Sequence, residues 1–261
     1  MKDFNLKSAI NTKEAVKLFS GRSAFLAGGM TLLPAMKLGL AEYTNLINIK
    51  KIKSLSGIKV SSKSLRIGAT TKHTDVADSK EVGKSIPSLA VLAEGIGDPQ
   101  VRNRGTIGGS IANNDPAADY PSACLALNAT IHTNKRKILA DKFFKGMFET
   151  DLKKGELIEN VEFQVPEKSA YAKFPNPASR YAIVGVYVAK FKTEIRVAIT
   201  GVESFVFRCK KIEDALSDNF SPSAIDNINI SSKGFNADIH ASAEYRAHII
   251  KVMAKKAVSS C

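Results

Sequence analysis

The sequence predicts an α+β protein built from three successive pieces. A short apolar run, Ala24 to Ala27, meets a Gly-Gly pair and then a helix-compatible segment, which is typical of a strand, a tight turn and a helix start. Two apolar runs separated by the polar SSKS, Ile58 to Val60 and Leu65 to Gly68, predict a hairpin in the second piece. After Pro166, two more strands and an amphipathic helix over Ala243 to Val258 predict a separate α+β piece.

Length and composition indicate a globular protein with a core of its own. The chain has 261 residues, of which 44% are hydrophobic, and this suits one large or two ordinary domains. No apolar run approaches the roughly 20 residues that span a bilayer, and MKDFNLKSAINTKEA lacks the apolar core of a signal peptide. A cytoplasmic location without a transmembrane segment is therefore expected.

The three cysteines, Cys124, Cys209 and Cys261, are odd in number and widely scattered. This pattern argues against a disulfide framework and against Cys-x-x-Cys metal or iron–sulfur ligation. Any metal chemistry connected with this chain is therefore expected on another chain.

The formal net charge of +13 raises the possibility of nucleic-acid binding. The lysines, however, are spread along the chain, and no helix-turn-helix, zinc or aromatic RNP pattern occurs among them. Most of them are expected on solvated surface, with the remainder facing an anionic cofactor or an acidic partner subunit. The sequence thus predicts no nucleic-acid partner.

In the first piece, Phe4 to Ser8 reads as extended, and Asn11 followed by Glu14 is a capping-box-like start for a helix that Ser20-Gly21 ends. After the Gly-Gly turn, Leu46 to Ile52 reads as a strand that closes a small lobe.

In the second piece, Thr70-Thr71 is expected to cap a short helix containing His73. A lone histidine is more often structural than catalytic. Ser85 to Ile96 has helical apolar spacing and leads to the next glycine-rich stretch. The elements expected after that stretch are a buried helix over Tyr120 to Leu127 and strands over Ala129 to Thr133, Leu157 to Val165, Ile183 to Phe191 and Glu194 to Ser204.

The stretch GDPQVRNRGTIGGSIANNDPAAD, residues 97 to 119, concentrates groups suited to holding phosphate. Gly105, Gly108 and Gly109 could adopt φ > 0 and let the backbone approach a ligand, and successive N–H groups in such a turn form an anion-binding concavity. Thr106 and Ser110 add hydroxyls, and Arg102 and Arg104 add positive charge. The residues expected to accept from ribose or ribityl hydroxyls are Asn113, Asn114, Asp115 and Asp119. The alternative is a plain glycine-rich turn between two elements.

A second glycine turn lies in FLAGGMTLLPAMK, residues 25 to 37. A strand, a tight turn and a helix start would offer unpaired N–H groups to a diphosphate. The stretch lacks the G-x-G-x-x-G of a Rossmann fold and the G-x-x-x-x-G-K-[ST] of a P-loop. Two separate glycine turns, each followed by a hydroxyl residue, indicate one extended ligand that is bound from two sides.

These motifs resemble a known family. AGGMTLLPAMKLGL, IGATTKHTDV and GDPQVRNRGTIGGSIANNDPAADYP are similar to successive signatures of the FAD-binding medium subunit of molybdenum hydroxylases, the carbon monoxide dehydrogenase and xanthine dehydrogenase group. The resemblance continues through KFPNPASRYAIVGV, VAITGVESFVFRC and DIHASAEYRAHIIKVMAKKAV, so it covers nearly the whole chain in order.

The resemblance implies a two-lobed FAD-binding domain of the vanillyl-alcohol-oxidase (PCMH) type followed by a C-terminal α+β domain. The implied boundaries are residues 1–56 for the first lobe, 57–165 for the second lobe and 166–261 for the C-terminal domain. FAD would lie in the cleft where the three meet. The cofactor-binding residues carried over from the family are Ala27, Gly28, Gly29, Met30, Thr31, Thr106, Gly108, Gly109, Ser110, Asp119, Leu157, Ile158 and Lys173.

Within that set the resemblance implies different roles. The two glycine turns would hold the diphosphate and nearby ribose, Leu157 or Ile158 would border the flavin or adenine, and Lys173 would lie near the isoalloxazine. Ile96 stands where xanthine dehydrogenases place an aromatic residue, so the contact there would be aliphatic. No catalytic side chain and no metal ligand is expected.

The family's function implies electron transfer, because the flavin carries the redox chemistry. Electrons would come from the [2Fe–2S] clusters of an iron–sulfur small subunit, which serves a molybdopterin large subunit, and would pass through FAD to an external acceptor. A dimer of heterotrimers is the implied assembly.

Two further alternatives stay open on the sequence. A self-contained FAD-dependent oxidoreductase of the same superfamily, such as the enolpyruvyl reductases or the vanillyl-alcohol oxidase group, would turn over a substrate by itself. A degenerate relative would keep the fold as an assembly platform, but intact glycines at both turns argue against it.

Overall fold

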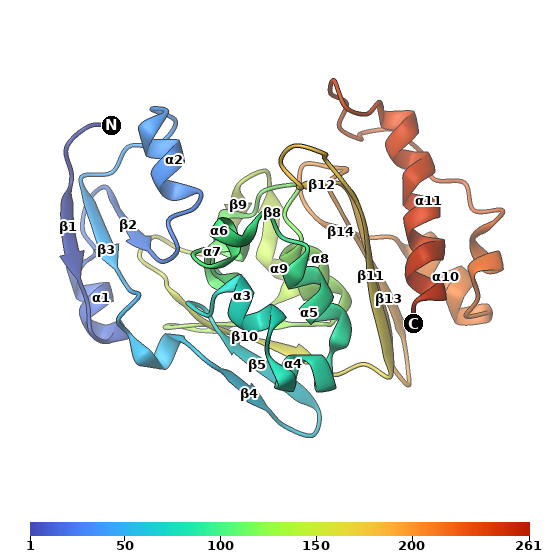
Figure 1. The fold of residues 1–261 in the computed structure, drawn as a ribbon, viewed down its shortest axis with the longest axis horizontal. Coiled ribbons are helices and arrows are strands. Elements are labelled where there is room, and N and C mark those ends of the chain that lie inside the picture. Colours follow the sequence, from blue (N-terminus) through green and yellow to red (C-terminus); the bar gives the residue numbers. More distant parts are fainter.

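The computed structural model describes residues 1–261 and has the α+β architecture that the sequence predicts. Three sheets follow one another along the chain and a short hairpin forms a fourth. In Figure 1 the blue N-terminal lobe lies at one end, a green helical region lies in the centre, and a sheet covered by the red C-terminal helix lies at the other end.

The N-terminal lobe is a parallel sheet of order β1-β3-β2 with two short helices. Its elements are β1 (Asn5–Ser8), α1 (Thr12–Leu18), β2 (Ser23–Leu26), α2 (Leu32–Lys37), β3 (Asn45–Asn48) and the 3-10 turn η1 (Lys53–Leu55). The expected helix start is confirmed: Asn11 is the N-cap of α1, and Glu14 N donates to its Oδ1 at 2.8 Å. The Glu14 carboxylate accepts from Ile10 N at 2.8 Å, one residue before the position that a capping box requires. The expected strand from Leu46 to Ile52 is wrong beyond Asn48, because the chain turns there and buries Ile52 just before η1.

The central region is a five-stranded antiparallel sheet of order β4-β5-β10-β6-β7 with helices packed on it. Its strands are β4 (Ile58–Val60), β5 (Ser64–Gly68), β6 (Thr130–Thr133), β7 (Lys137–Leu139) and β10 (Ile158–Gln164), with a small hairpin of β8 (Phe144–Gly146) and β9 (Glu149–Thr150). Its helices are α3 (His73–Ala77), α4 (Lys80–Ser85), α5 (Pro87–Glu94), α6 (Pro99–Arg102), α7 (Ile107–Asn113), α8 (Tyr120–Ala126) and α9 (Ala140–Phe143). The predicted β4–β5 hairpin is confirmed.

Two local predictions in the central region are wrong. The N-cap of α3 is Lys72, because the Thr71 hydroxyl instead bonds the backbone N–H of Gly57 at 3.0 Å. The predicted helix from Ser85 to Ile96 begins at Pro87, since α4 occupies the residues before it.

The C-terminal piece is an antiparallel sheet of order β11-β12-β13-β14. It consists of β11 (Lys168–Pro175), β12 (Ala182–Lys190), β13 (Ile195–Thr200), β14 (Phe207–Arg208), α10 (Lys210–Asp218), the 3-10 turn η2 (Pro222–Ile225) and α11 (Ala243–Ser259). The predicted terminal helix is confirmed, whereas the sequence did not predict β11 and α10.

Both faces of the C-terminal sheet are buried, and this fixes it against the central region. Along β12, Val184, Val186 and Val188 join the core beneath α10 and α11, while Tyr187 and Ala189 join the core of the central region. Helices α5 and α8 therefore cover one face of the sheet and α11 covers the other (Figure 1). We retain the boundaries 1–56, 57–165 and 166–261 as a proposal.

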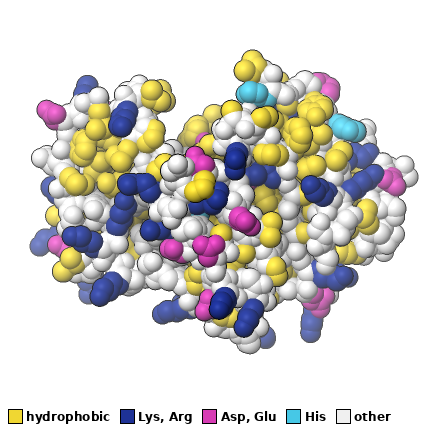
Figure 2. All heavy atoms as spheres, viewed as in Figure 1, with side chains coloured by type: hydrophobic (Ala, Val, Ile, Leu, Met, Phe, Trp, Pro, Cys, Tyr) yellow, Lys and Arg dark blue, Asp and Glu magenta, His cyan; other side chains and the backbone are white.

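Lys and Arg side chains are scattered across the face drawn in Figure 2 and are interspersed with acidic side chains. This face therefore shows the dispersed charge that the sequence indicates. None of the helices combines the length and the apolar character that a membrane crossing requires.

A buried asparagine ties the end of α7 to the β8–β9 hairpin. Asn114 has φ +45° and no exposed surface, and its Nδ2 donates to the carbonyls of Gly146 and Glu149, each at 2.8 Å. The N–H of Phe148 donates back to the Asn114 carbonyl at 3.1 Å. Asn114 is therefore a structural residue, and because none of its surface is exposed, its predicted role as an acceptor for ribose hydroxyls is wrong.

Asn114→Ala should lower the free energy of unfolding by about 3 kcal/mol, because it removes two buried hydrogen bonds and puts a Cβ-bearing residue with no polar compensation in the left-handed region. Asn114→Gly is the matched control, since it loses the same bonds without the backbone strain, and its loss should be smaller. Urea denaturation of the three proteins measures the difference; equal losses for Ala and Gly would contradict the contribution of backbone strain.

Candidate functional site

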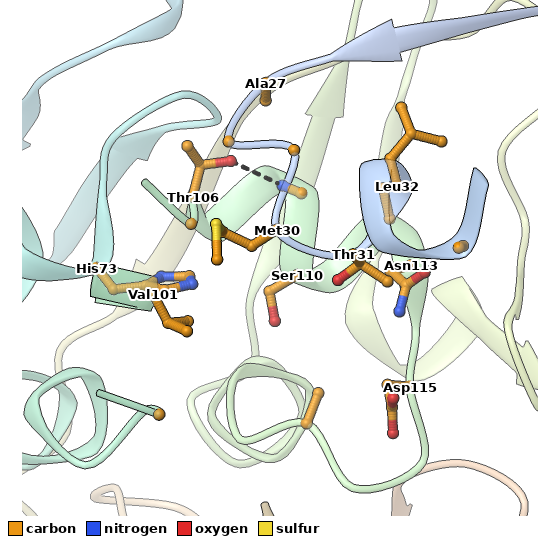
Figure 3. Close-up of a pocket in the computed structure, with 18 of the residues that line it drawn as sticks. Ala27, Met30, Thr31, Leu32, His73, Val101, Thr106, Ser110, Asn113 and Asp115 are labelled. Atoms are coloured by element: carbon orange, nitrogen blue, oxygen red, sulfur yellow. Dashed lines mark hydrogen bonds between the residues drawn. The ribbon is translucent and has the colours of Figure 1, made fainter. Parts of the chain in front are cut away.

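A pocket of about 500 Å³ lies where the three pieces meet. Its lining includes residues between 24 and 43 of the N-terminal lobe, His73 and residues between 96 and 119 of the central region, and Ser179, Arg180 and Tyr181 of the C-terminal piece. Figure 3 shows Met30, Thr31, Thr106 and Ser110 around one shared space. The two glycine-rich stretches that the sequence singled out thus line a single cavity.

The two glycine stretches touch each other directly. A Cβ atom at Gly28 would overlap the carbonyl oxygen of Arg104, and it would lie 2.8 Å from the Arg104 carbonyl carbon and 2.9 Å from Gly105 Cα. Only glycine permits this approach of two backbones. We call the segment 27–32 the first corner and the segment 104–110 the second corner.

The sequence suggested positive φ for Gly105, Gly108 and Gly109, and this is wrong for all three. Gly29 has φ +76°, as expected for a tight turn. Gly108 and Gly109 instead lie inside α7, and they are absent from the glycines with positive φ. Gly108 is small for packing, since a Cβ there would come within 2.5 Å of Ala69 Cβ.

The first corner supplies free hydrogen-bond donors. The backbone N–H groups of Gly28, Gly29, Met30, Thr31 and Leu32 donate to no backbone acceptor. A run of such donors along a pocket wall is an arrangement that binds an anion such as a diphosphate. The helix behind it, α2, has only six residues, so these N–H groups matter more than the helix dipole.

The second corner supplies hydroxyls, because most of its N–H groups are already bonded. Ile107 N donates to Thr71 O and Gly108 N to Ala69 O, while Gly109 N donates to Thr106 Oγ1 at 3.2 Å, the bond drawn in Figure 3. The side chains of Thr31, Ser110 and Asn113 point into the pocket in the same view. These groups suit the hydroxyls of a ribose or ribityl chain.

The two arginines expected to bring charge to the ligand do not line the pocket. Arg102 Nη1 donates to the carbonyl of Ile96 at 3.2 Å and bonds Gly97 as well, so its guanidinium braces the chain entering α6. Arg104 contributes through its backbone, which packs on Gly28. Their predicted role as ligand-facing charges is therefore wrong in this structure.

Asp119 is a buried carboxylate in the pocket wall that bonds two side chains of the C-terminal sheet. Its Oδ2 lies 3.1 Å from Lys173 Nζ, and its Oδ1 accepts from the Tyr171 hydroxyl. Lys173 Nζ also donates to Gly95 O at 2.8 Å. Burial raises the pKa of Asp119, whereas the Lys173 charge and the Tyr171 hydroxyl lower it.

His73 lines the pocket with only 5% of its surface exposed. Its Nε2 faces Gly105, where a Cβ would come within 2.5 Å, and its buried Nδ1 has no hydrogen-bond partner. Burial and the charge of Arg102 lower the pKa of His73 to about 4. The imidazole is therefore neutral near neutral pH.

Most of the predicted cofactor-binding residues line the pocket, and four do not. Leu157 packs in the core of the N-terminal lobe, Ile158 packs in the central core, Gly108 packs on Ala69, and Lys173 reaches the pocket only through Asp119. The assignment of all thirteen residues to the cofactor stays a prediction.

The pocket also has lining residues that the sequence alone did not identify. Tyr43 comes from the segment before β3, and Arg180 and Tyr181 come from the loop between β11 and β12. The motif KFPNPASRYAIVGV contains that loop, but nothing in its spacing shows that it folds back on residues 115–119. Ile96 does line the pocket, so an aliphatic contact is available there.

Comparisons with known proteins agree with this geometry. The family model for the FAD binding domain in molybdopterin dehydrogenase matches residues 2–167. The glyceraldehyde dehydrogenase medium chain of Sulfolobus acidocaldarius is 35% identical over 277 aligned positions, which cover 98% of this chain and 97% of the relative. The xanthine dehydrogenase FAD-binding subunit of Escherichia coli is 26% identical, with 96% and 93% covered.

Among solved structures, a carbon monoxide dehydrogenase from Hydrogenophaga pseudoflava that lacks the Mo-pyranopterin moiety of its cofactor has a similar chain. That chain superposes with a TM-score of 0.88 at 31% identity, covering 99% of this chain and 97% of the other. The resemblance found in the motifs therefore extends over the complete fold.

Gly28→Ala should weaken FAD binding at least about tenfold, because the added Cβ forces the two corners apart. Gly83→Ala is the matched control, since Gly83 lies in α4 with nothing within 4 Å of the Cβ that alanine would add, and it should bind FAD as the wild type does. Fluorescence titration of the apoprotein with FAD measures both affinities. Unchanged binding by Gly28→Ala would contradict the need for contact between the corners.

His73 should make the protein less stable in mild acid. Its folded-state pKa is lowered from 6.5 to about 4, so the unfolded chain binds the proton more tightly and stability falls as the pH drops below 6.5. The loss between pH 7 and pH 5 should be about 2 kcal/mol from this residue. Urea denaturation of the wild type and His73→Gln at both pH values isolates the contribution of His73; identical pH dependence in the two proteins would refute it.

Proposed function

This chain belongs to the FAD-binding medium subunits of molybdenum hydroxylases, and from this membership we propose that it passes electrons from an iron–sulfur partner subunit through FAD to an external acceptor. The observation that carries the proposal is the run of free N–H groups from Gly28 to Leu32 in a pocket closed by the second corner. FAD supplies the redox chemistry when it is bound.

The residues present fit FAD in three respects. The free N–H groups of the first corner match a diphosphate, and the hydroxyls and amide of Thr31, Ser110 and Asn113 match sugar hydroxyls. The pocket also has apolar walls, with Ile96 and Val101 among its lining residues. A pocket of this size and mixed lining is typical of a cofactor site.

We propose that each group holds rather than reacts. The first corner anchors the diphosphate, and Thr106, Gly109 and Ser110 hold the adjoining sugar from the other side. Asp119 orients the ligand, and Lys173 and Tyr171 hold the Asp119 carboxylate in place. Neutral His73 closes the floor beside Gly105 without adding charge.

Leu157, Ile158 and Gly108 support the pocket from behind in this proposal. Leu157 lies in the core of the N-terminal lobe, although it directly precedes β10 of the central sheet. Leu157 therefore links the two lobes: its side chain is buried in the N-terminal lobe, and its backbone continues into the central sheet. We infer that this link fixes the angle between the lobes. Ile158 and Gly108 do the same for β10 and α7 within the central region.

The proposed partners are an iron–sulfur small subunit and a molybdopterin large subunit, assembled as a dimer of heterotrimers in the cytoplasm. The names of the relatives support this, because a medium chain is one of several chains. The substrate would be oxidised on the large subunit, so this chain alone should oxidise none.

The test is purification of the native complex through a tag on this chain. FAD, iron and molybdenum should appear together in one particle, because the three cofactors would reside on three associated subunits. The isolated chain loaded with FAD should reduce dyes with artificial donors and oxidise no substrate. Absorption spectra and metal analysis measure the first result.

The tagged Gly28→Ala chain is the control, and its complex should contain iron and molybdenum with little flavin. A particle that holds flavin without either metal, together with substrate turnover by the purified chain, would instead establish the self-contained oxidoreductase.

A further inference from the structure

One wall of the pocket is the loop between β11 and β12, residues 176–181, and the loop is rigidly built. Asn176 Oδ1 accepts from Ala178 N at 2.9 Å and from Ser179 N at 3.1 Å. The backbone of Asn176 donates to Tyr181 O at 2.8 Å and accepts from Arg180 N at 2.9 Å. A single asparagine thus closes the loop with four hydrogen bonds.

The loop holds Arg180 in an unusual backbone conformation. Arg180 has φ +61°, the left-handed region that residues other than glycine and asparagine seldom adopt. Such strain persists only where the surroundings enforce it, and it is concentrated at binding sites. Here the Asn176 bonds enforce it and present the Arg180 side chain at the pocket wall while it stays exposed to solvent.

Arg180 is also the only lysine or arginine that lines the pocket. The acidic lining residues are Asp115 and Asp119, and the charge of Asp119 is offset by Lys173 at 3.1 Å. The guanidinium of Arg180 takes part in none of the ion pairs of the chain. A cation without a protein partner at a pocket wall is available for a ligand.

Arg180 and the groups suited to the FAD diphosphate come from different parts of the chain, although both line the pocket. Ala182 N, directly after the loop, donates to Ala117 O at 3.2 Å, so the loop packs on residues 115–119. Tyr181 lines the pocket together with Asp115 and Asp119, and burial and the charges of these two carboxyls raise its pKa. The free N–H groups of residues 28–32 belong to a different lobe.

We propose that Arg180 makes the solvent-facing wall of the pocket selective for a small anionic oxidant that takes electrons from the reduced cofactor. The inference rests on the proposed function and names the class of its external acceptor. Oxidation of the two-electron-reduced FAD removes two electrons and two protons. With ferricyanide as the probe, two ions each gain one electron to become ferrocyanide, and the protons pass to water.

The experiment compares the full-length chain, loaded with FAD and reduced chemically, in four forms: wild type, Arg180→Asn, Arg180→Glu and Lys192→Gln. Asparagine tolerates positive φ, so Arg180→Asn removes the charge without adding strain. Lys192 is an exposed lysine in the turn after β12, at the opposite end of that strand from Arg180, so Lys192→Gln makes the same change in net charge away from the pocket. Stopped-flow absorbance follows reoxidation.

Arg180→Asn should slow reoxidation by ferricyanide about tenfold at low ionic strength, and Arg180→Glu should slow it further, because a trivalent anion loses its local attraction. Both effects should shrink as added salt screens the charge. With the cation tris(phenanthroline)cobalt(III), the order of the variants should reverse. Lys192→Gln should match the wild type with both oxidants.

A third arm with NAD⁺ and NADP⁺ identifies the source of the anion. If the wild type reduces either nucleotide and Arg180→Asn reduces it more slowly, the natural oxidant is a phosphate-bearing nicotinamide nucleotide. An Arg180 effect confined to ferricyanide would indicate a small anion of another kind.

The proposal is overturned if Lys192→Gln slows reoxidation by ferricyanide as much as Arg180→Asn does. It is also overturned if the reoxidation rates of the Arg180 variants, relative to the wild type, are the same with the anionic and the cationic oxidant. It is also overturned if Arg180→Asn weakens FAD binding in a fluorescence titration of the apoprotein, since Arg180 would then hold the cofactor. Failure of the wild type to bind FAD in that same titration would refute the proposed function itself before any oxidant is added.

Discussion

The contact between the backbone of Gly28 and the carbonyl of Arg104 is the constraint on which the site depends. It brings a strand end of one sheet against the entry to a helix on another sheet, with no side chain between them. Because two peptide units meet directly, the space on either side has fixed walls. The free N–H groups of the first corner and the hydroxyls of the second corner consequently face one cavity rather than two separate surfaces.

The two corners differ in how their hydrogen bonds are used, and this gives them different roles. The second corner uses its N–H groups on Thr71, Ala69 and Thr106, so it is rigid and presents hydroxyls. The first corner leaves five N–H groups without a backbone acceptor, which is unfavourable unless water or a ligand satisfies them. An anionic ligand bound there removes that deficit, and its binding should therefore stabilise the junction between the lobes.

Local patterns in the sequence predicted the elements that local physics determines. The helix start at Asn11, the β4–β5 hairpin and the terminal helix follow from neighbouring residues, and each is confirmed. The structural reason for a glycine at position 108 could not be predicted, because it is the close approach of Ala69, which lies far away in the sequence. A Cβ at position 108 would clash with Ala69. Asn114 has the polar side chain of a ligand, yet it is fully buried, does not line the pocket, and bonds a hairpin more than thirty residues away.

The wall that faces solvent depends on pairing between the C-terminal sheet and residues 115–119, which no motif spacing reveals. Lys173 and Tyr171 on β11 hold Asp119, and the loop after them carries Arg180. The match to the FAD-binding domain ends at residue 167, so all three side chains lie outside it, although Arg180 lines the pocket and the other two hold its wall through Asp119. The two corners lie within the match, whereas the loop that carries the exposed Arg180 lies beyond it. Under our proposal, selectivity for an oxidant can change in this loop while the two corners stay the same.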